Sequence, residues 1–253
     1  KFMRDMPEIL SGSGYGLLRD NRFVMVSQAG KIQAEEGGAV AIEGSVFTIP
    51  DIRIPKPPVE FDLKGVGPLH AMMSLLNNKP FEFSKKAGRG VDDIQARANI
   101  SAKVFSFLKK DVKLDDVDLR VYGTLTNVES DVLVPGKSFK AKTLNISVSK
   151  DLLILSGSGK LSGVPFSGEW TQPRSEPNLP GEININLIAT EEALALLNID
   201  LPKGLFKGKA PMNLVLNLVK DQPVKFFINS ELKGIEISIP SLNWRKQSKT
   251  LGS

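Results

Sequence analysis

The sequence contains no cysteine and a single histidine, His70, among its 253 residues. Without cysteine the chain has no disulfide bond, thiol nucleophile or cysteine-ligated metal, although this leaves its cellular compartment open. His70 is the one imidazole that could serve as a base or ligand, and no carboxylate lies within five residues of it. It stands at the start of an amphipathic segment, where a lone histidine is usually a surface or packing residue.

Long apolar runs and clustered cations are also missing. No apolar run approaches the roughly 18 residues of a membrane-spanning helix. No run of lysine and arginine exceeds two residues, and basic residues do not alternate with aromatic ones, so we expect no nucleic-acid partner. The net charge of +5 mildly favours an anionic partner such as lipid headgroups or nucleic acid, but a solvated basic surface is the commoner explanation.

The motifs of enzymes are incomplete. Gly12–Gly16 (GSGYG) resembles a phosphate-binding loop but lacks the following Lys-Ser/Thr and helix. Ser167 lacks the glycine two residues before it that a nucleophile elbow requires. The clustered aspartates lie beside lysines at strand ends or turns, where aspartate normally caps backbone amides: Asp92, Asp93, Asp111, Asp115 and Asp116. We therefore predict a protein that is not an enzyme and has no metal or cofactor.

Strict alternation of apolar and polar residues is the dominant pattern. Across residues 143–170 it predicts three short strands, separated by turns at Lys150-Asp151 and at 162–165. Successive residues of a strand point to opposite faces, so Leu144, Ile146 and Val148 share one face of the sheet. The same pattern recurs in the segments 96–104, 117–125, 183–187, 212–218, 226–232 and 235–239. It predicts a mainly β fold, a long, curved antiparallel sheet of repeated hairpins shaped like a groove or taco.

Two segments have helical spacing instead. Residues 68–77 (PLHAMMSLLN) and 190–197 (TEEALALL) predict two short helices over an end or edge of the sheet, the second with Thr190 as its N-cap. We interpret residues 1–253 as one continuous β-rich module with a hinge at Thr171–Gly181, and we expect it to be a piece of a longer protein. A weak internal repeat relates Gly44 and Pro50 to Gly234 and Pro240; chance similarity of two hairpins is the alternative.

The apolar face of this sheet is the candidate functional surface. An exposed apolar patch above a few hundred Å² marks an interaction site, and a trough could sequester acyl chains with headgroups at its rim. The residues expected on the inner face are Ile183, Ile185, Leu187, Leu214, Leu216 and Leu218, together with Leu144, Ile146 and Val148. The alternative is that these side chains form the core of a closed sandwich.

The order of several motifs resembles a known family. They include Gly67-Pro68-Leu69 with its helix and Ala87-Gly88. The others are 96–102 (ARANISA), 108–111 with 115–117, 123–128 (GTLTNV), 155–165 (LSGSGKLSGVP), Trp170, and the tail 232–246. In this order the chain resembles the domain that accompanies AsmA-like C-terminal regions in large proteobacterial envelope proteins.

The resemblance implies a location and a role. Members of that group have an inner-membrane anchor and a long periplasmic β-rich body, and the wider repeating-β-groove group moves phospholipid between membranes. It implies a periplasmic, non-enzymatic segment that shields phospholipid acyl chains between the inner and outer membranes. Its partners would then be acyl lipid, membranes reached through other parts of the full-length protein, and adjacent β segments of the same chain. The alternative is a structural envelope-biogenesis module without its own lipid site.

Overall fold

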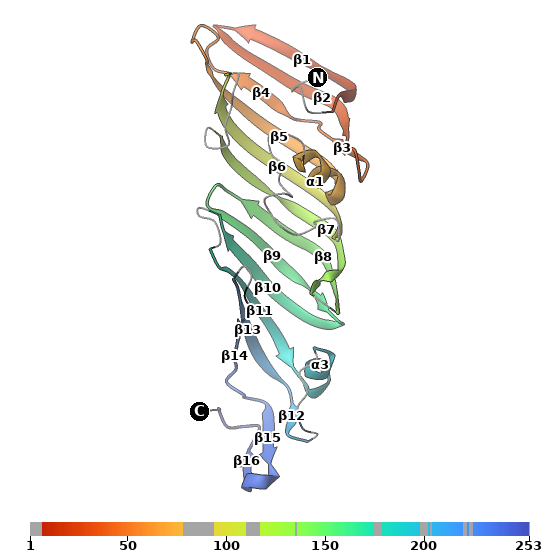
Figure 1. Cartoon of the computed structure of the whole chain (residues 1–253), viewed down its shortest axis with the longest axis vertical. Helices are drawn as coiled ribbons and strands as arrows, with labels where there is room; N and C mark the ends of the chain where they lie inside the picture. The colour runs from red at the N-terminus through yellow and green to blue at the C-terminus, as the bar shows by residue number, and fades with distance from the viewer. Residues whose placement is uncertain are drawn as a thin grey trace. The chain divides into compact units, whose positions relative to one another are not determined.

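The structure is a computed structural model that describes residues 7–77, 94–109, 117–134, 136–174, 179–197, 202, 204–219, 222 and 225–252. The chain divides into two compact units. The first unit comprises Lys1–Val128 and Asn145–Leu152, and the second comprises Glu129–Leu144 and Leu153–Ser253. Within the described residues, each unit is built from antiparallel strands and contains one short α-helix (Figure 1).

The first unit contains the elements β1 to β6 and α1, the beginning of β7, the end of β8 and the first residue of β9. Their bounds are β1 Ile9–Arg19, β2 Arg22–Gln33, β3 Ala39–Ala41, β4 Val46–Ile49, β5 Pro58–Pro68, α1 Leu69–Asn77, β6 Gln95–Phe107 and β7 Asp118–Val134. The remaining elements are β8 Lys137–Val148, β9 Leu152–Leu161, β10 Val164–Pro173, β11 Gly181–Ala189, α3 Glu191–Leu196, β12 Phe206–Gly208, β13 Ala210–Leu218, β14 Lys225–Asn229, β15 Ile235–Ile239, η3 Pro240–Leu242 and β16 Trp244–Lys246.

Hydrogen bonding joins most of the described strands into one sheet. This 13-stranded sheet has the order β1-β2-β3-β5-β6-β7-β8-β9-β10-β11-β13-β14, with β4 pairing with β2 and β5. A three-stranded sheet of order β12-β15-β16 belongs to the second unit. The predicted mainly β class, with a long antiparallel sheet of hairpins and two short helices, is confirmed. Its predicted curvature into a groove stays a prediction.

Tight turns with left-handed residues close two of the hairpins. Asp20 and Asn21 join β1 to β2 with φ of 49° and 63°, and Ser162 and Gly163 join β9 to β10 with φ of 49° and 88°. Two consecutive residues with positive φ match the right-handed twist of the flanking strands. The segment 143–170 therefore folds as predicted, although its first strand, β8, begins earlier, at Lys137.

The first unit shows how the alternation separates two faces. In the β5–β6 register, Val59, Phe61 and Leu63 lie opposite Ser106, Val104 and Ala102. Directly opposed residues of antiparallel strands point to the same side, so these six side chains share one face, which is apolar except for Ser106. The intervening residues Glu60, Asp62 and Lys64 point to the other, polar face, together with Lys103 and Ser101.

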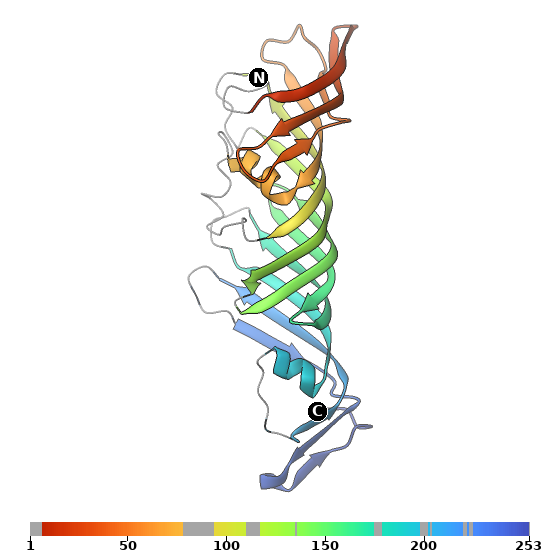
Figure 2. The same ribbon diagram turned by 90° about the vertical axis from the view of Figure 1, so that its right-hand side faces the viewer.

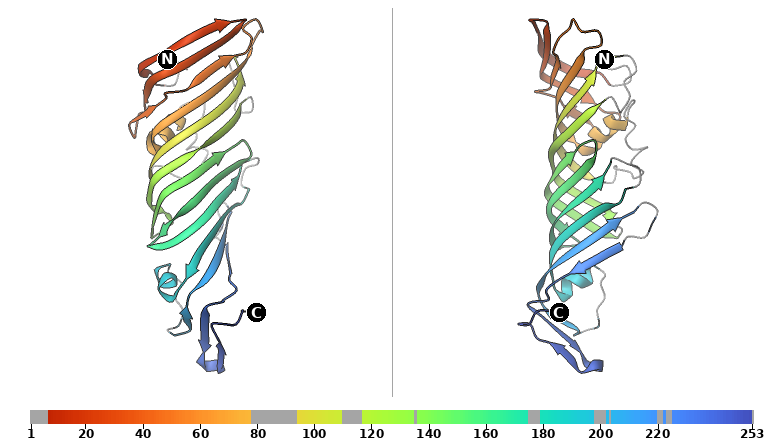
Figure 3. Two further views of the ribbon diagram at one scale, coloured as in Figure 1. Left: turned by 180° about the vertical axis from the view of Figure 1, so that it is seen from behind. Right: turned by 90° about the vertical axis from the view of Figure 1, so that its left-hand side faces the viewer.

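Helix α1 covers one end of that apolar face. It follows β5 directly and folds back, so that Ala71 and Leu75 form a buried cluster with Ala34 and Val40. Figure 2 shows α1 standing off one side of the strands, and the reverse view in Figure 3 shows the other side of β5 and β6 in front of the helix. The position of α1 agrees with the prediction that the helices lie over an end or edge of the sheet.

The weak internal repeat has a local structural counterpart. Gly44 and Gly234 have φ of 80° and 92°, in the region that glycine adopts without steric cost. The short strands that follow them, β4 and β15, end at Ile49 and Ile239, each directly before a proline.

Several predicted features fall on or beside residues outside the described ranges. The predicted hinge at Thr171–Gly181 includes the end of β10, residues 175–178 outside the described ranges, and the start of β11, and it stays a prediction. Asp92, Asp93, Asp111, Asp115 and Asp116 lie outside the described residues, as does Ala87-Gly88 of the resemblance.

Candidate functional site

Six of the nine predicted groove residues lie on one face of the second unit. Strands β11 and β13 are neighbours, and their register pairs Ile183 with Leu216 and Ile185 with Leu214. Leu187 lies opposite Met212, and Leu218 lies opposite Gly181. Opposed residues share a face, so the alternation in two segments almost thirty residues apart becomes one continuous apolar surface.

Helix α3 and the small sheet cover one end of this surface. Thr190 caps α3, with its Oγ1 accepting a hydrogen bond of 3.0 Å from the backbone N–H of Ala193, as predicted. The cap holds Leu194 over Leu187, in a buried cluster with the following residues: Ala189, Phe206, Ala210, Met212 and Ile235. Leu187 is therefore a core residue, with 8% of its surface exposed.

The rest of the surface has less cover. We define the open strip as Trp170, Ile183, Ile185, Leu214, Leu216 and Leu218, all of which are half-buried. Trp170 joins it from β10, because it lies directly opposite Ile183. On the far side, Ile228 of β14 lies opposite Leu214 and is 45% exposed. The open strip thus adjoins the covered cluster at Ile185, a member of the strip that packs against the cluster.

Polar side chains occupy the reverse face of the same strands. Asn213 Nδ2 donates hydrogen bonds to Asn184 Oδ1 at 2.6 Å and to Asn186 Oδ1 at 3.0 Å. These three amides link β11 to β13 on the side away from Ile183 and Leu216. The reverse face also holds Val215 and, opposite it, Phe227, which is 55% exposed, so the amides make this face more polar than the open strip but not wholly polar.

The remaining three predicted residues do not join the open strip. Leu144 belongs to the second unit but is only 4% exposed, and it packs so closely on Gly157 that a Cβ there would come within 2.8 Å of Leu144 Cδ2. It is a core residue. Ile146 and Val148 lie on the part of β8 that belongs to the first unit, where both are half-buried.

The sequence reasoning missed several apolar residues on these faces. In the first unit, Phe47 stacks between Phe23, at a ring-centre distance of 6.3 Å, and Phe61, at 4.8 Å. In the second unit, Phe166 and Trp170 were not included, although Phe166, Gly168 and Trp170 alternate with polar residues along β10. That alternation indicated that Phe166 and Trp170 share a face of their strand. It did not indicate which strands lie beside β10.

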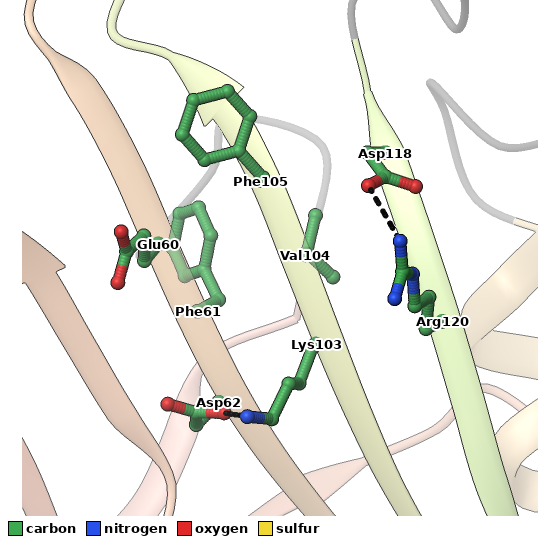
Figure 4. A pocket seen from close by; sticks show the side chains of 8 residues that line it. All are labelled: Glu60, Phe61, Asp62, Lys103, Val104, Phe105, Asp118 and Arg120. Carbon is green, nitrogen blue, oxygen red and sulfur yellow. Dashed lines mark ion pairs between the residues drawn. The ribbon is translucent and has the colours of Figure 1, made fainter.

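A shallow hollow lies on the polar face of the first unit. It measures about 340 Å³ and is lined by Glu60, Phe61, Asp62, Lys103, Val104, Phe105, Asp118 and Arg120 (Figure 4). Lys103 Nζ lies 3.8 Å from Asp62 Oδ1, and an Arg120 guanidinium nitrogen lies 3.9 Å from Asp118 Oδ2. All four side chains are more than half exposed, so these ion pairs contribute little to stability.

The single histidine lies beside a carboxylate. His70 Nε2 lies 3.2 Å from Glu36 Oε2, a carboxylate brought close by the fold from 34 residues away. No group of three or more His, Asp and Glu side chains among the described residues is placed to hold a metal ion. In the same residues, neither helix combines the length and apolar character needed to cross a bilayer.

Comparisons with protein-family models, with curated proteins and with solved structures gave no match.

Proposed function

We propose that this chain is a non-enzymatic lipid-binding segment that shields phospholipid acyl chains on the open strip of the second unit. The observation that carries the proposal is the register of β11 and β13, which gathers Ile183, Leu214 and Leu216 on one face beyond the α3 cluster, with Ile185 at the border of that cluster. Each methylene group that moves from water onto such a surface contributes about 0.8 kcal/mol.

The charge and the resemblance to AsmA-like envelope proteins support the same role. A net charge of +5 favours an anionic lipid over a neutral one in the encounter with a membrane surface. On this proposal the chain works in the periplasm, between the inner and outer membranes, and the full-length protein is anchored in the inner membrane. Adjacent β segments of the same protein then continue the apolar surface.

Binding of a labelled lipid tests the proposal. The probe is phosphatidylglycerol with a pyrene-labelled acyl chain, added to the purified chain, and pyrene fluorescence measures binding. Leu216→Glu places a carboxylate on the open strip and is expected to weaken binding at least tenfold, because acyl chains do not solvate a charge.

Val215→Glu is the matched control. Val215 precedes Leu216 on β13, is also half-buried, and points to the polar face opposite Asn184. It is expected to bind the probe like the wild type, with circular dichroism checking that both variants are folded. Equal binding by folded Leu216→Glu and wild-type protein would overturn the proposal, as would a wild-type chain that binds no probe.

A structural envelope module is the second candidate, and β1 favours it. This strand of 11 residues ends the described strand order, so one of its edges has no neighbouring strand there. Tyr15, Leu17 and Leu18 are each more than half exposed along it. An open edge with apolar side chains is a template for pairing with another strand. A chain that self-associates through β1 and binds no lipid would support this role.

A further inference from the structure

Five asparagines gather on the reverse face of β11, β13 and β14, on the side away from the open strip. This amide face consists of Asn184, Asn186, Asn213, Asn217 and Asn229. Their side chains share one side because Asn186 lies opposite Asn213, which in turn lies opposite Asn229. Asparagine is depleted in strands, since its side chain competes with the backbone for hydrogen bonds. The formation of strands therefore does not explain this concentration.

Hydrogen bonds orient the three amides at the centre of this face. Asn213 uses both hydrogens of Nδ2, on Asn184 Oδ1 at 2.6 Å and on Asn186 Oδ1 at 3.0 Å. Asn213 Oδ1 is thereby left to accept a hydrogen bond, and the Nδ2 groups of Asn184 and Asn186 are left to donate. Asn186 is exposed and the other two are half-buried. The centre of the amide face thus presents two donor groups beside one acceptor, in an arrangement that the protein itself holds.

An exposed aromatic ring stands beside these amides. Phe227 of β14 lies opposite Val215, which lies opposite Asn184, so its ring is on the amide face. It is 55% exposed. Neighbouring strands are about 4.8 Å apart, so roughly 10 Å separates the backbone of Phe227 from that of Asn184. The face therefore offers an apolar ring and oriented amides to one molecule that has both apolar and hydrogen-bonding groups.

The charged side chains lie at the border of the amide face. In the described parts of its strands and of β10 they are Glu169, opposite Asn184, and both Glu182 and Lys225, opposite Asn217. Two carboxylates and one ammonium leave this face slightly negative, although the whole chain has a net charge of +5. Electrostatics therefore disfavours a polyanion here, and the amides at the centre suit an uncharged partner.

We propose that the amide face binds an uncharged, extended glycan chain. The C–H groups on the face of a sugar ring pack against Phe227. Sugar hydroxyl groups both donate and accept, so they match the Nδ2 donors and the Oδ1 acceptor of the central amides. A peptide strand would instead need the free backbone groups of a sheet edge, and β11 and β13 each have a neighbour on both sides. The proposal goes beyond the lipid site, because it concerns the opposite side of the same strands.

Nuclear magnetic resonance with chitotetraose, an uncharged extended tetrasaccharide, tests this proposal on the wild-type chain. The sugar is expected to shift the side-chain N–H signals of Asn184, Asn186 and Asn213 in a saturable way. The methyl signals of Ile228, which lies opposite Leu214 on the other face, are expected to stay unchanged. An absence of saturable shifts in the asparagine signals would overturn the proposal. Shifts that appear with rising protein concentration, without sugar, would assign the face to a second copy of the chain and overturn it too.

Two variants on the amide face should weaken the binding of chitotetraose. Phe227→Ala removes the ring and Asn186→Ala removes a donor, and each is expected to raise the Kd about fivefold. Tyr122→Ala is the matched control, because Tyr122 is an equally exposed aromatic residue in the first unit and is expected to leave the Kd unchanged. Equal Kd values for folded Phe227→Ala and Tyr122→Ala would refute the site.

The sugar site and the lipid site can fail separately. Leu216→Glu, which is expected to weaken lipid binding, alters the open strip and is expected to bind chitotetraose like the wild type, because Leu216 points away from the amide face. A folded Leu216→Glu variant that loses both ligands would show that the two faces are not independent sites and would overturn the proposal.

Discussion

Ile183 on β11 and Leu216 on β13 lie directly opposite each other, so their side chains meet on the apolar face of the second unit. Ile183 also lies opposite Trp170 of β10, and Leu216 also lies opposite a residue of β14. This pair defines the centre of the open strip. If the strip is a lipid surface, its residues must matter less for folding than those beneath α3.

Two leucine truncations on the same face test this difference. Leu187→Ala removes a buried side chain from the α3 cluster and is expected to lower the free energy of unfolding by about 3 kcal/mol. Leu216→Ala removes a half-buried one and is expected to cost about 1 kcal/mol. Urea denaturation measures both. Equal losses near 3 kcal/mol would show that Leu216 belongs to a closed core, which is the sandwich alternative.

Removing the hydroxyl group of Ser106, in the first unit, is expected to stabilise the folded protein. Ser106 is 5% exposed, and its Oγ has no hydrogen-bond partner in the described residues. Ser106→Ala removes that desolvated group and is expected to raise the free energy of unfolding by about 1 kcal/mol. Ser101→Ala is the control on the same strand, because Ser101 Oγ accepts from Lys64 Nζ at 2.8 Å on the exposed face. A destabilised Ser106→Ala variant would contradict the assignment.

Lys246 anchors the small sheet of the second unit. It is 6% exposed, and its Nζ donates to the carbonyls of Leu232, Ile235 and Gln247 at 2.7, 3.1 and 3.1 Å. Lys246→Met fits the same space but leaves three carbonyls without this donor, so we expect a loss of about 2–3 kcal/mol in unfolding free energy. Lys160→Met, at an exposed position on β9, is expected to change it by less than about 0.5 kcal/mol. Similar values for the two variants would refute this role.

The interaction between Asp51 and Arg53 is expected to make a pH-dependent contribution to stability. The Arg53 side-chain hydrogen bond, followed by the Arg53 backbone N–H, lowers the pKa of Asp51 from 3.8 to about 2. Because the folded-state pKa is the lower one, the stabilising contribution is complete above about pH 3.8 and is lost as the pH falls through 2.

Titration of the Asp51 carboxyl carbon by nuclear magnetic resonance measures this pKa directly. Arg53→Gln is expected to raise the pKa of Asp51 toward 3.8, whereas Lys56→Gln, three residues further along, leaves it low. An unchanged midpoint in Arg53→Gln would show that another group holds the carboxylate ionised.

The sequence predicted the parts of the fold that depend on local pattern. Alternation identified the strand around Ile183–Leu187 and the faces of β6 and β7, because the period of two is written in each strand separately. The helix at 190–197 was recognisable from Thr190 and two following acids, and its cap has the expected geometry.

The alternation did not predict which distant strands pair with each other, or in which register. Nothing in the alternation of β8 distinguishes Leu144, which packs on Gly157 as a core residue, from Ile183, which lies on the open strip. The contact between His70 and Glu36, and the absence of a hydrogen-bond acceptor for Trp170 Nε1 among the described residues, likewise depend on the three-dimensional neighbours of each residue.

Site-specific photo-crosslinking tests the central claim most directly. A photo-reactive amino acid replaces Leu216 in one variant and Val215 in another, so that neighbouring positions on β13 report on opposite faces of one strand. Each variant is illuminated with vesicles of radiolabelled phosphatidylglycerol, and lipid attached to the chain is counted. A lipid surface on the open strip predicts strong labelling at position 216 and little at position 215; equal labelling at both, or none at 216, would contradict it.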